Sequence, residues 1–301
     1  MVNAIVMSVV LLMMFALPVQ SLAAETVKVR YLASVYADSK DGAFNVPHGV
    51  ACTGKSVIVA DTENDRLVLF ALEQGVVTGG DEWKIPELTG PVRAQINSKG
   101  EVLVLDGRKL RIVKLSPEGS FKGYFDAVGL PPGPGVVPRN LKVDSSDNVY
   151  VLDIFGGRVL VLNAGGNFQK QIPFPEGYAF ISDVAVDSRG VVYLLDSVKA
   201  MIYSAPKDAQ TFTPFTKGLE EHVKFPTDMA VDGGGTIFVV DHNGGIIAML
   251  GQNGAFLGHA AAFGWKGGQL RYPSQICVND KGNLFIADRS NNRIQMFEVI
   301  K

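Results

Sequence analysis

The sequence predicts an all-β protein made of six similar units arranged in a ring. Successive repeats of a short apolar run end in an aspartate 43 to 47 residues after the previous one. These aspartates are Asp61, Asp106, Asp153, Asp196, Asp241 and Asp288. A period in the forties built from short β-type runs is typical of a radial array of four-stranded blades. We therefore expect a six-bladed β-propeller of antiparallel blades, and the 33 glycines and 15 prolines suit its many turns.

The last repeat shows how each unit is built. Pro273 precedes the first strand, because proline lacks the N–H that the interior of a strand uses. That strand runs to a turn at 279–282, where Gly282 can supply a positive φ. The second strand, 284–288, is apolar on both faces, as expected for a strand buried between neighbouring blades. A polar segment ending at Arg293 then leads into a third strand.

The segment 27–35 is predicted to close the ring. It alternates like a strand but belongs to no repeat of its own, and the last repeat reaches Lys301 with only three strands. If the N-terminal segment supplies the missing outer strand, main-chain bonds join the two ends of the chain and two sheet edges disappear.

The first 24 residues have the features of a secretory signal peptide. They contain no ionisable side chain, residues 4–19 are almost wholly apolar, and small residues precede Glu25. An uncleaved membrane anchor is the alternative, although about 16 apolar residues interrupted by Pro18 are short for a span. We expect a signal peptide at 1–24 and a single propeller domain at 25–301, exported to the periplasm or outside the cell, with no membrane span after cleavage.

The repeat resembles the NHL repeat, whose copies assemble into β-propellers. Its marks are a leading proline, the strand-ending aspartate and a following arginine, as in Pro47, Asp61 and Arg66 of the first unit. The fourth unit departs most, with Ile181 and Met201 in place of the proline and the arginine. The resemblance covers about residues 40–300 and implies an exported, bacterial-type six-bladed propeller.

The repeated aspartates and arginines are expected to be structural. An aspartate at the end of a strand can accept N–H groups of a turn, and an arginine can pack its stem along the blade while its head meets carbonyls or a carboxylate. A pair that recurs from unit to unit fits such a role, whereas a catalytic site needs one copy.

Candidate chemistry lies at the central channel. The position two residues beyond the leading proline should ring the channel mouth, and His48 occupies the preceding position in the first unit. Asn140, Asp183 and Asp228 could hold a hard cation such as Ca²⁺; Arg93 could pair with them or bind an anionic group. The alternative is a polar lining that bonds the backbone of adjacent blades. In chain order the ring comprises Gly49, Arg93, Asn140, Asp183, Asp228 and Gln275.

A second group of candidates lies in the loops that share one face of the disc. Aromatic side chains amid glycine and proline at loop tips suit recognition of a protein or peptide, although they could equally pack onto the propeller body. These candidates are Trp83, Tyr178, Phe180, His242 and Trp265.

The two cysteines are expected to be separate buried thiols. Cys52 lies five residues after Pro47 and Cys277 lies four after Pro273, so strand alternation places them on opposite intrinsic faces. Packed sheets lie about 10 Å apart, which exceeds the reach of a disulfide. Because blades converge near the axis, a disulfide remains the alternative.

The formal charge of −2 argues against a nucleic-acid partner. We expect a monomeric scaffold that binds an unknown protein or peptide in the cell envelope or outside the cell, rather than an enzyme. The alternative is a metal-dependent hydrolase or lactonase, or a lyase, with its site at the channel mouth. Similar lyases would require three channel histidines, and similar lactonases a glutamate beside Asn and Asp; neither set is complete here. A subunit of a redox assembly is a third possibility, although no haem-attachment C-x-x-C-H occurs.

Overall fold

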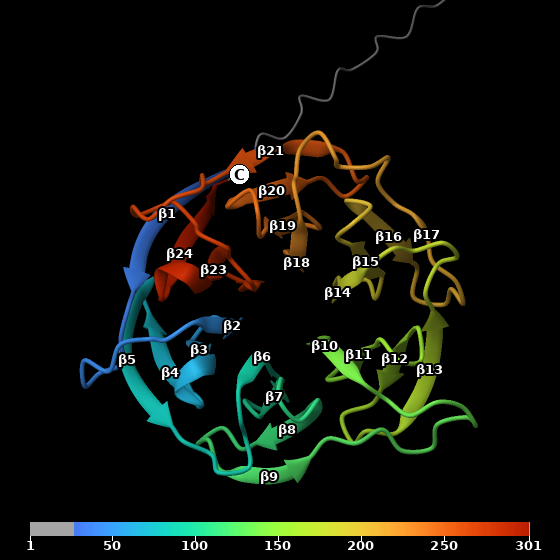
Figure 1. The fold of residues 1–301 in the computed structure, drawn as a ribbon, viewed down its shortest axis with the longest axis horizontal. Coiled ribbons are helices and arrows are strands. Elements are labelled where there is room, and N and C mark those ends of the chain that lie inside the picture. Colours follow the sequence, from blue (N-terminus) through green and yellow to red (C-terminus); the bar gives the residue numbers. More distant parts are fainter. Residues whose placement is uncertain (1–26, 301) are drawn as a thin grey trace, which may run out of the picture.

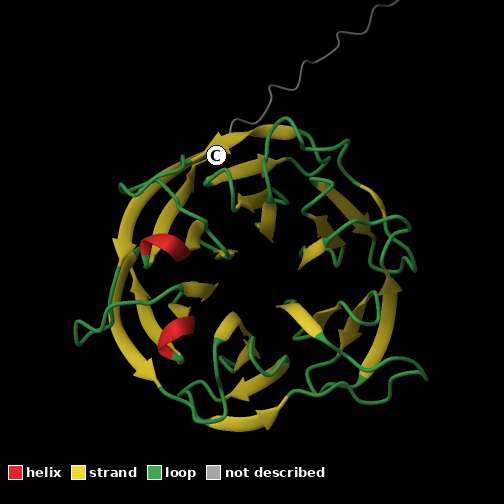
Figure 2. Ribbon diagram, in the orientation of Figure 1, coloured by secondary structure: helices red, strands yellow, loops and turns green. Residues whose placement is uncertain are grey.

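A computed structural model describes residues 27–300 and shows six blades around a central channel (Figure 1). Each blade is a four-stranded antiparallel sheet whose first strand faces the channel and whose last strand lies at the rim. The described helices are two short 3-10 turns, η1 (Thr62–Asn64) and η2 (Arg289–Asn291) (Figure 2). The predicted six-bladed propeller is therefore confirmed, while the predicted signal peptide lies outside the described residues.

The strands follow one order in every blade, from the channel outward. Blades one to three comprise β2 (Pro47–Cys52), β3 (Ser56–Asp61), β4 (Arg66–Glu73) and β5 (Val76–Trp83); β6 (Pro91–Ile96), β7 (Val102–Asp106), β8 (Arg111–Leu115) and β9 (Phe121–Tyr124); β10 (Pro138–Val143), β11 (Val149–Asp153), β12 (Arg158–Leu162) and β13 (Phe168–Pro173). Blades four to six comprise β14 (Ile181–Val186), β15 (Val192–Asp196), β16 (Met201–Ala205) and β17 (Thr213–Pro214); β18 (Pro226–Val231), β19 (Ile237–Asp241), β20 (Ile246–Leu250) and β21 (Phe256–Ala260); β22 (Ile276–Val278), β23 (Asn283–Asp288), β24 (Arg293–Ile300) and β1 (Lys28–Val35).

The N-terminal strand closes the ring as the sequence predicts. Strand β1 pairs antiparallel with β24, from Lys28 opposite Ile300 to Val35 opposite Ile294. Val27, just before β1, is buried in the core between blades five and six. Val35 packs against the core between blades six and one. The two ends of the chain thus stabilise one sheet and both of its neighbours.

The second strand of each blade is apolar on both faces because each face packs against a different neighbour. In β15, Leu194 contributes to the core shared with blade three, whereas Leu195 contributes to the core shared with blade five. Both side chains are fully buried. This two-sided burial explains the uninterrupted apolar runs that mark the repeat.

The aspartate that ends each second strand fixes the loop leading into its own blade. The carboxylate of Asp61 accepts the N–H of Asn45 at 2.7 Å, and the same carboxylate accepts Nε–H of Arg66 at 2.7 Å. In blade six, Asp288 accepts Nε–H of Arg293 at 2.6 Å. All six strand-ending aspartates are fully buried. Their recurrence and contacts agree with the predicted structural role.

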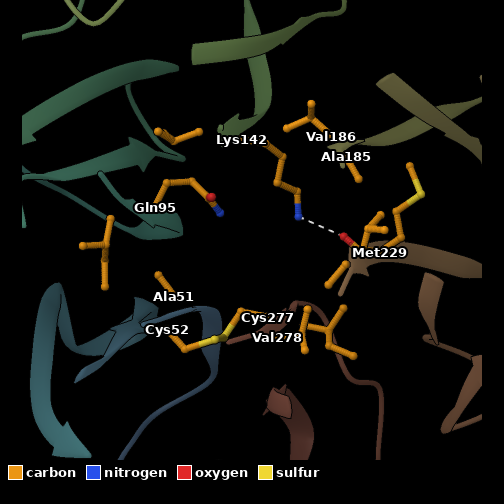
Figure 3. Close-up of a pocket in the computed structure, with 14 residues that line it drawn as sticks. Ala51, Cys52, Gln95, Lys142, Ala185, Val186, Met229, Cys277 and Val278 are labelled. Carbon is orange, nitrogen blue, oxygen red and sulfur yellow. Dashed lines mark hydrogen bonds between the residues drawn. A yellow bond between two sulfur atoms is a disulfide. The ribbon is translucent and has the colours of Figure 1, made fainter. Parts of the chain in front are cut away.

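Cys52 and Cys277 form a disulfide, so the expectation of two separate thiols is wrong (Figure 3). Their Cα atoms lie 6.0 Å apart, within the usual range for a bridge. The residues sit on the innermost strands of blades one and six, where the wedge-shaped blades converge. The spacing of about 10 Å applies to sheets packed face to face, not to strands that meet at the axis.

Removing this bridge should destabilise the ring. The bridge joins residues 225 positions apart, so the double variant Cys52→Ala, Cys277→Ala is expected to lose about 2–5 kcal/mol of unfolding free energy. Urea unfolding measures the loss, and dithiothreitol should shift the wild-type midpoint but not that of the variant. Equal midpoints for the oxidised wild type and the variant would contradict the expectation.

Candidate functional site

A β-bulge near the start of the inner strand separates the residues that line the mouth from those that face the axis. In blades one to five the pairing register shifts between the first and third residues of this strand, as between Pro138 and Asn140. The residue in between is unpaired and points differently from its neighbours. The five bulge residues line one cavity: His48, Val92, Arg139, Ser182 and Thr227.

We call this space the mouth cavity; it has a volume of about 380 Å³. Besides the bulge residues, its walls comprise Arg93, Leu105, Gly107, Leu110, Pro138, Ile154, Phe180 and Phe225. The rings of Phe180 and Phe225 stack with centroids 6.3 Å apart, and the Arg139 guanidinium lies 4.4 Å from the Phe180 centroid. No aspartate or glutamate is among these described lining residues. The cavity is therefore apolar at its walls and cationic at two points.

The charges at the mouth are close enough to affect one another. Although Arg139 is exposed at the surface, partial desolvation of its guanidinium and the nearby charge of Arg93 lower its pKa. Burial, together with the charges of Arg93 and Arg289, lowers the pKa of His48 from 6.5 to about 3. His48 is therefore neutral at physiological pH, and the positive charge of the cavity comes from its arginines.

Beneath the mouth cavity, four of the predicted channel residues are fully buried: Asn140, Asp183, Asp228 and Gln275. Three of them bind the backbone of the following blade. Asp183 accepts the N–H of Met229 at 2.6 Å, Asp228 that of Ile276 at 3.1 Å, and Gln275 that of Val50 at 3.0 Å. In each case the donor N–H belongs to the residue that follows the corresponding channel position of the next blade.

The equivalent position in blade one is Gly49, which cannot form such a bond. A Cβ atom there would lie 3.0 Å from Gln275 Oε1 and 2.9 Å from the Cβ of Ala60. The glycine thus makes room for the bond from blade six. In blade two the equivalent Arg93 points back, and its Nη1 donates to the carbonyls of Val92 at 3.0 Å and His48 at 3.4 Å.

A buried lysine that the sequence reasoning missed completes this axial cluster. Lys142 Nζ lies 3.7 Å from Asp183 Oδ2 and 3.6 Å from Asp228 Oδ1. It also donates to the Met229 carbonyl at 3.1 Å (Figure 3). Asn140 Nδ2 donates to Asp183 Oδ1 at 2.5 Å, and Arg93 Nε lies 3.7 Å from Asp228 Oδ2. Two carboxylates therefore face two cations at the centre of the ring.

Burial and the neighbouring Asp228 carboxylate raise the pKa of Asp183 to about 7. The Lys142 ammonium and the N–H of Met229 act in the opposite direction. Near neutral pH the charge on Asp183 therefore depends on the Lys142 ammonium.

These residues do not fit a bound divalent cation. The four carboxylate oxygens of Asp183 and Asp228 each face an N–H group or a cationic nitrogen. The Lys142 ammonium lies next to both carboxylates, so a cation held by them would lie against a like charge. Within residues 27–300 no cluster of three or more His, Cys, Asp or Glu is arranged to hold a metal.

Lys142 leaves a signal in the sequence. It lies four residues after the leading proline, where the other repeats have small or neutral residues.

Lys142 also lines a second cavity of about 200 Å³, which we call the far cavity, together with Gln95, Met229 and the disulfide (Figure 3). The residues that the other five repeats have at the position of Lys142 are Ala51, Gln95, Ala185, Ala230 and Cys277.

The five aromatic loop candidates do not form one cluster. Phe180 lines the mouth cavity. Tyr178 and Trp265 are exposed, Trp265 by 75%. The Nδ1 atom of His242 lies 2.9 Å from the Pro273 carbonyl. Trp83 packs against the turn at Gly119 of blade two, where an added Cβ would lie 2.4 Å from the indole.

The neutral state of the half-buried His48 predicts a loss of stability in acid. Below pH 6.5 the unfolded chain gains a proton at this position, whereas the folded chain gains it only near pH 3, so stability falls as the pH drops through this window. From pH 7.5 to pH 4.5, His48→Gln should lose about 2 kcal/mol less unfolding free energy than the wild type. Urea unfolding at both pH values tests this, with exposed His259→Gln as control; equal losses in His48→Gln and the wild type would refute it.

The fold defines the chain as a six-bladed β-propeller. Comparison with known proteins adds a family match for one of its blades. The NHL repeat family model matches residues 270–297, in blade six. The chain therefore contains an NHL repeat, and the six-bladed architecture together with this match supports an NHL-repeat propeller. No curated protein matches the sequence.

Solved structures share the fold at low sequence identity. Virginiamycin B lyase from Staphylococcus aureus matches with a TM-score of 0.60 and 15% identity, over 91% of this chain and 100% of that chain. A gluconolactonase from Xanthomonas campestris matches with a TM-score of 0.63 and 13% identity, over 90% of this chain and 91% of that chain. The PQQ-bound aldose sugar dehydrogenase from Streptomyces coelicolor matches with a TM-score of 0.64 and 14% identity, over 91% of this chain and 98% of that chain. At these identities the likeness concerns the fold alone.

Proposed function

We propose that the protein binds a peptide, or a peptide segment of a protein, on the face that carries the mouth cavity. The observation that carries this proposal is a set of exposed apolar side chains around the cavity. Phe155 and Val198, in turns that leave second strands, are 67% and 63% exposed. Leu110 and Ile154 are exposed and also line the cavity. Apolar residues gathered on loops of a rigid scaffold mark interaction sites.

The ring supports such a role because it holds the loops rigidly. Buried carboxylates fix the loops leading into the blades, as Asp61 does for Asn45. The axial side chains fix each blade to the next. A surface that is ordered before its ligand arrives loses less conformational entropy on binding.

The proposal includes export, with residues 1–24 as the signal peptide and a mature chain that works as a monomer in the periplasm or outside the cell. The Cys52–Cys277 disulfide supports it, because disulfides persist in oxidising compartments. In residues 27–300 there is no long apolar helix of the kind that crosses a membrane. Mass spectrometry of the exported protein should give an N-terminus near Glu25; a retained N-terminal segment would contradict cleavage.

The alternative function, a metal-dependent hydrolase or a lyase at the channel, has less support. It would need a metal or a reactive group with access to substrate beside the channel acids. Here Lys142 and Arg93 face the two carboxylates. Of the four histidines in the sequence, only His48 lines the mouth cavity.

A library of random peptides displayed with free C-termini tests the proposed function. Peptides selected on the wild type should bind at least about tenfold more weakly to the triple variant Ile154→Ser, Phe155→Ser, Val198→Ser, because these side chains supply the apolar contact. Val76→Ser is the matched control, since Val76 is 59% exposed on the outer strand of blade one. Failure to enrich any peptide, or equal binding by the triple variant, would overturn the proposal.

A further inference from the structure

The mouth cavity contains cationic groups with unused hydrogen-bonding capacity. Arg139 is exposed to solvent, makes no ion pair or hydrogen bond to another side chain or carbonyl within residues 27–300, and stacks on the face of Phe180. Arg93 Nε and Thr227 Oγ1 are buried without a hydrogen-bond partner there. The acid closest to Arg93 is Asp228, 3.7 Å from Nε, and Asp228 also faces Lys142. Positive charge at the mouth is therefore incompletely compensated.

Such a pair of arginines indicates the charge of the ligand. A guanidinium presents planar N–H groups that match a carboxylate or another oxyanion. Arg93 and Arg139 come from adjacent blades, and the Thr227 hydroxyl lines the same cavity. No described carboxylate lines the cavity to satisfy them from within the chain. Arg139 is therefore open to pair with an anionic group of a ligand, and Arg93, which lies 3.7 Å from Asp228, is close to the same cavity.

The walls indicate what that anionic group is attached to. Phe180, Phe225 and Leu105 line the cavity together with the exposed side chains of Leu110 and Ile154. The volume of about 380 Å³ is near the lower end for ligand sites, and it suits the end of a chain rather than a folded surface. Exposed apolar side chains continue outward at Phe155 and Val198, which suits a ligand that extends beyond the cavity.

We propose that the mouth cavity binds the free C-terminal carboxylate of a peptide that ends in apolar residues. Arg139 and Arg93 bind the carboxylate, Phe180 and Phe225 contact the last side chain, and preceding residues lie across Ile154 and Phe155. This inference rests on the proposed peptide-binding function and specifies which part of the peptide is recognised.

The test uses fluorescent octapeptides with a Gly-Ser body and two C-terminal Leu, Phe, Val or Ile residues, each as the free acid and as the amide. Fluorescence polarisation with the full mature chain should show at least about tenfold tighter binding of the acids. Arg139→Gln should weaken the acids by about tenfold and leave the amides unchanged. Arg271→Gln, an exposed arginine in the loop leading into blade six and not in the cavity lining, should change neither.

The outcomes separate this inference from the function on which it rests. Equal binding of acid and amide, with loss in the Ile154→Ser, Phe155→Ser, Val198→Ser variant, would overturn carboxylate recognition and leave peptide binding intact. If no acid or amide binds, the carboxylate proposal is wrong, and failure of the random library as well would remove the peptide-binding function.

Discussion

A chain that begins at Tyr36, and so lacks β1, is expected to lose the cooperative unfolding of the ring. Its loss removes the strand that pairs with β24 and uncovers Phe297, whose ring packs edge to face with Tyr31 at 5.8 Å. It also removes Val27 and Val35 from the cores on either side of blade six. We expect a loss comparable to the whole stability of a domain, about 5–15 kcal/mol, because an open ring exposes sheet edges and core together.

Thermal unfolding followed by circular dichroism tests this prediction. A synthetic peptide of residues 27–36 should restore a cooperative transition when added in excess, since the exposed edge of β24 can accept a strand in trans. A peptide of the same composition in scrambled order is the control. If the shortened chain melts cooperatively near the full-length temperature without peptide, β1 does not close the ring energetically.

The second large effect is expected from Lys142→Met. The substitution keeps much of the side-chain volume but removes the ammonium beside two buried carboxylates. Losing one partner of a buried ion cluster leaves charge uncompensated, and we expect a cost of about 3–5 kcal/mol at pH 7.5. Urea unfolding measures it.

The cost should depend on pH in a definite direction. The pKa of Asp183 is raised to about 7 even with the ammonium present, and its removal raises that pKa further. The folded variant then holds a proton that the unfolded chain releases above about pH 4. Stability of the variant should therefore recover as the pH falls from 7.5 to 5, relative to that of the wild type.

A double-variant background separates charge from packing. With Asp183→Asn and Asp228→Asn present, Lys142→Met should cost much less, because the variant carries no acid pair for the ammonium to neutralise. An equal cost in both backgrounds would show that Lys142 acts through packing, and the ion cluster would then have no stabilising role.

The ring was predictable because it repeats. Each of the six equivalent aspartates independently predicted the end of a buried second strand. The additional strand at 27–35 could then complete only the last blade, which had three strands. Two-sided burial likewise follows from runs such as the one ending at Asp196. Errors in one repeat could not change the period of the whole set.

Features that belong to single repeats were harder to predict. The bulge after Pro138 turns Arg139 toward the mouth and leaves Asn140 buried at the axis. Strand alternation alone gave no sign of that separation. Lys142 was overlooked because the comparison of repeats stopped two residues short of it. The disulfide was misjudged because the spacing of packed sheets was applied where blades converge.

The mouth cavity itself is a product of tertiary structure. His48, Leu105, Arg139, Phe180 and Phe225 come from five blades and meet only when the ring closes. Phe180 and His48 were selected from the sequence, whereas Leu105 and Phe225 had no feature that distinguishes them from core residues. A site assembled from one or two residues per repeat leaves little trace in any single segment.

In this account Lys142, rather than a metal ion, neutralises the axial acids and so stabilises the ring. Elemental mass spectrometry of the protein, purified without chelators, gives the most direct test because it measures the divalent-metal content. We predict no stoichiometric Ca²⁺ or other divalent metal, and a melting temperature that EDTA leaves unchanged in the wild type and in the Asp183→Asn, Asp228→Asn variant. One metal ion per wild-type chain, absent from that variant and removed by EDTA with a fall in melting temperature, would contradict the account.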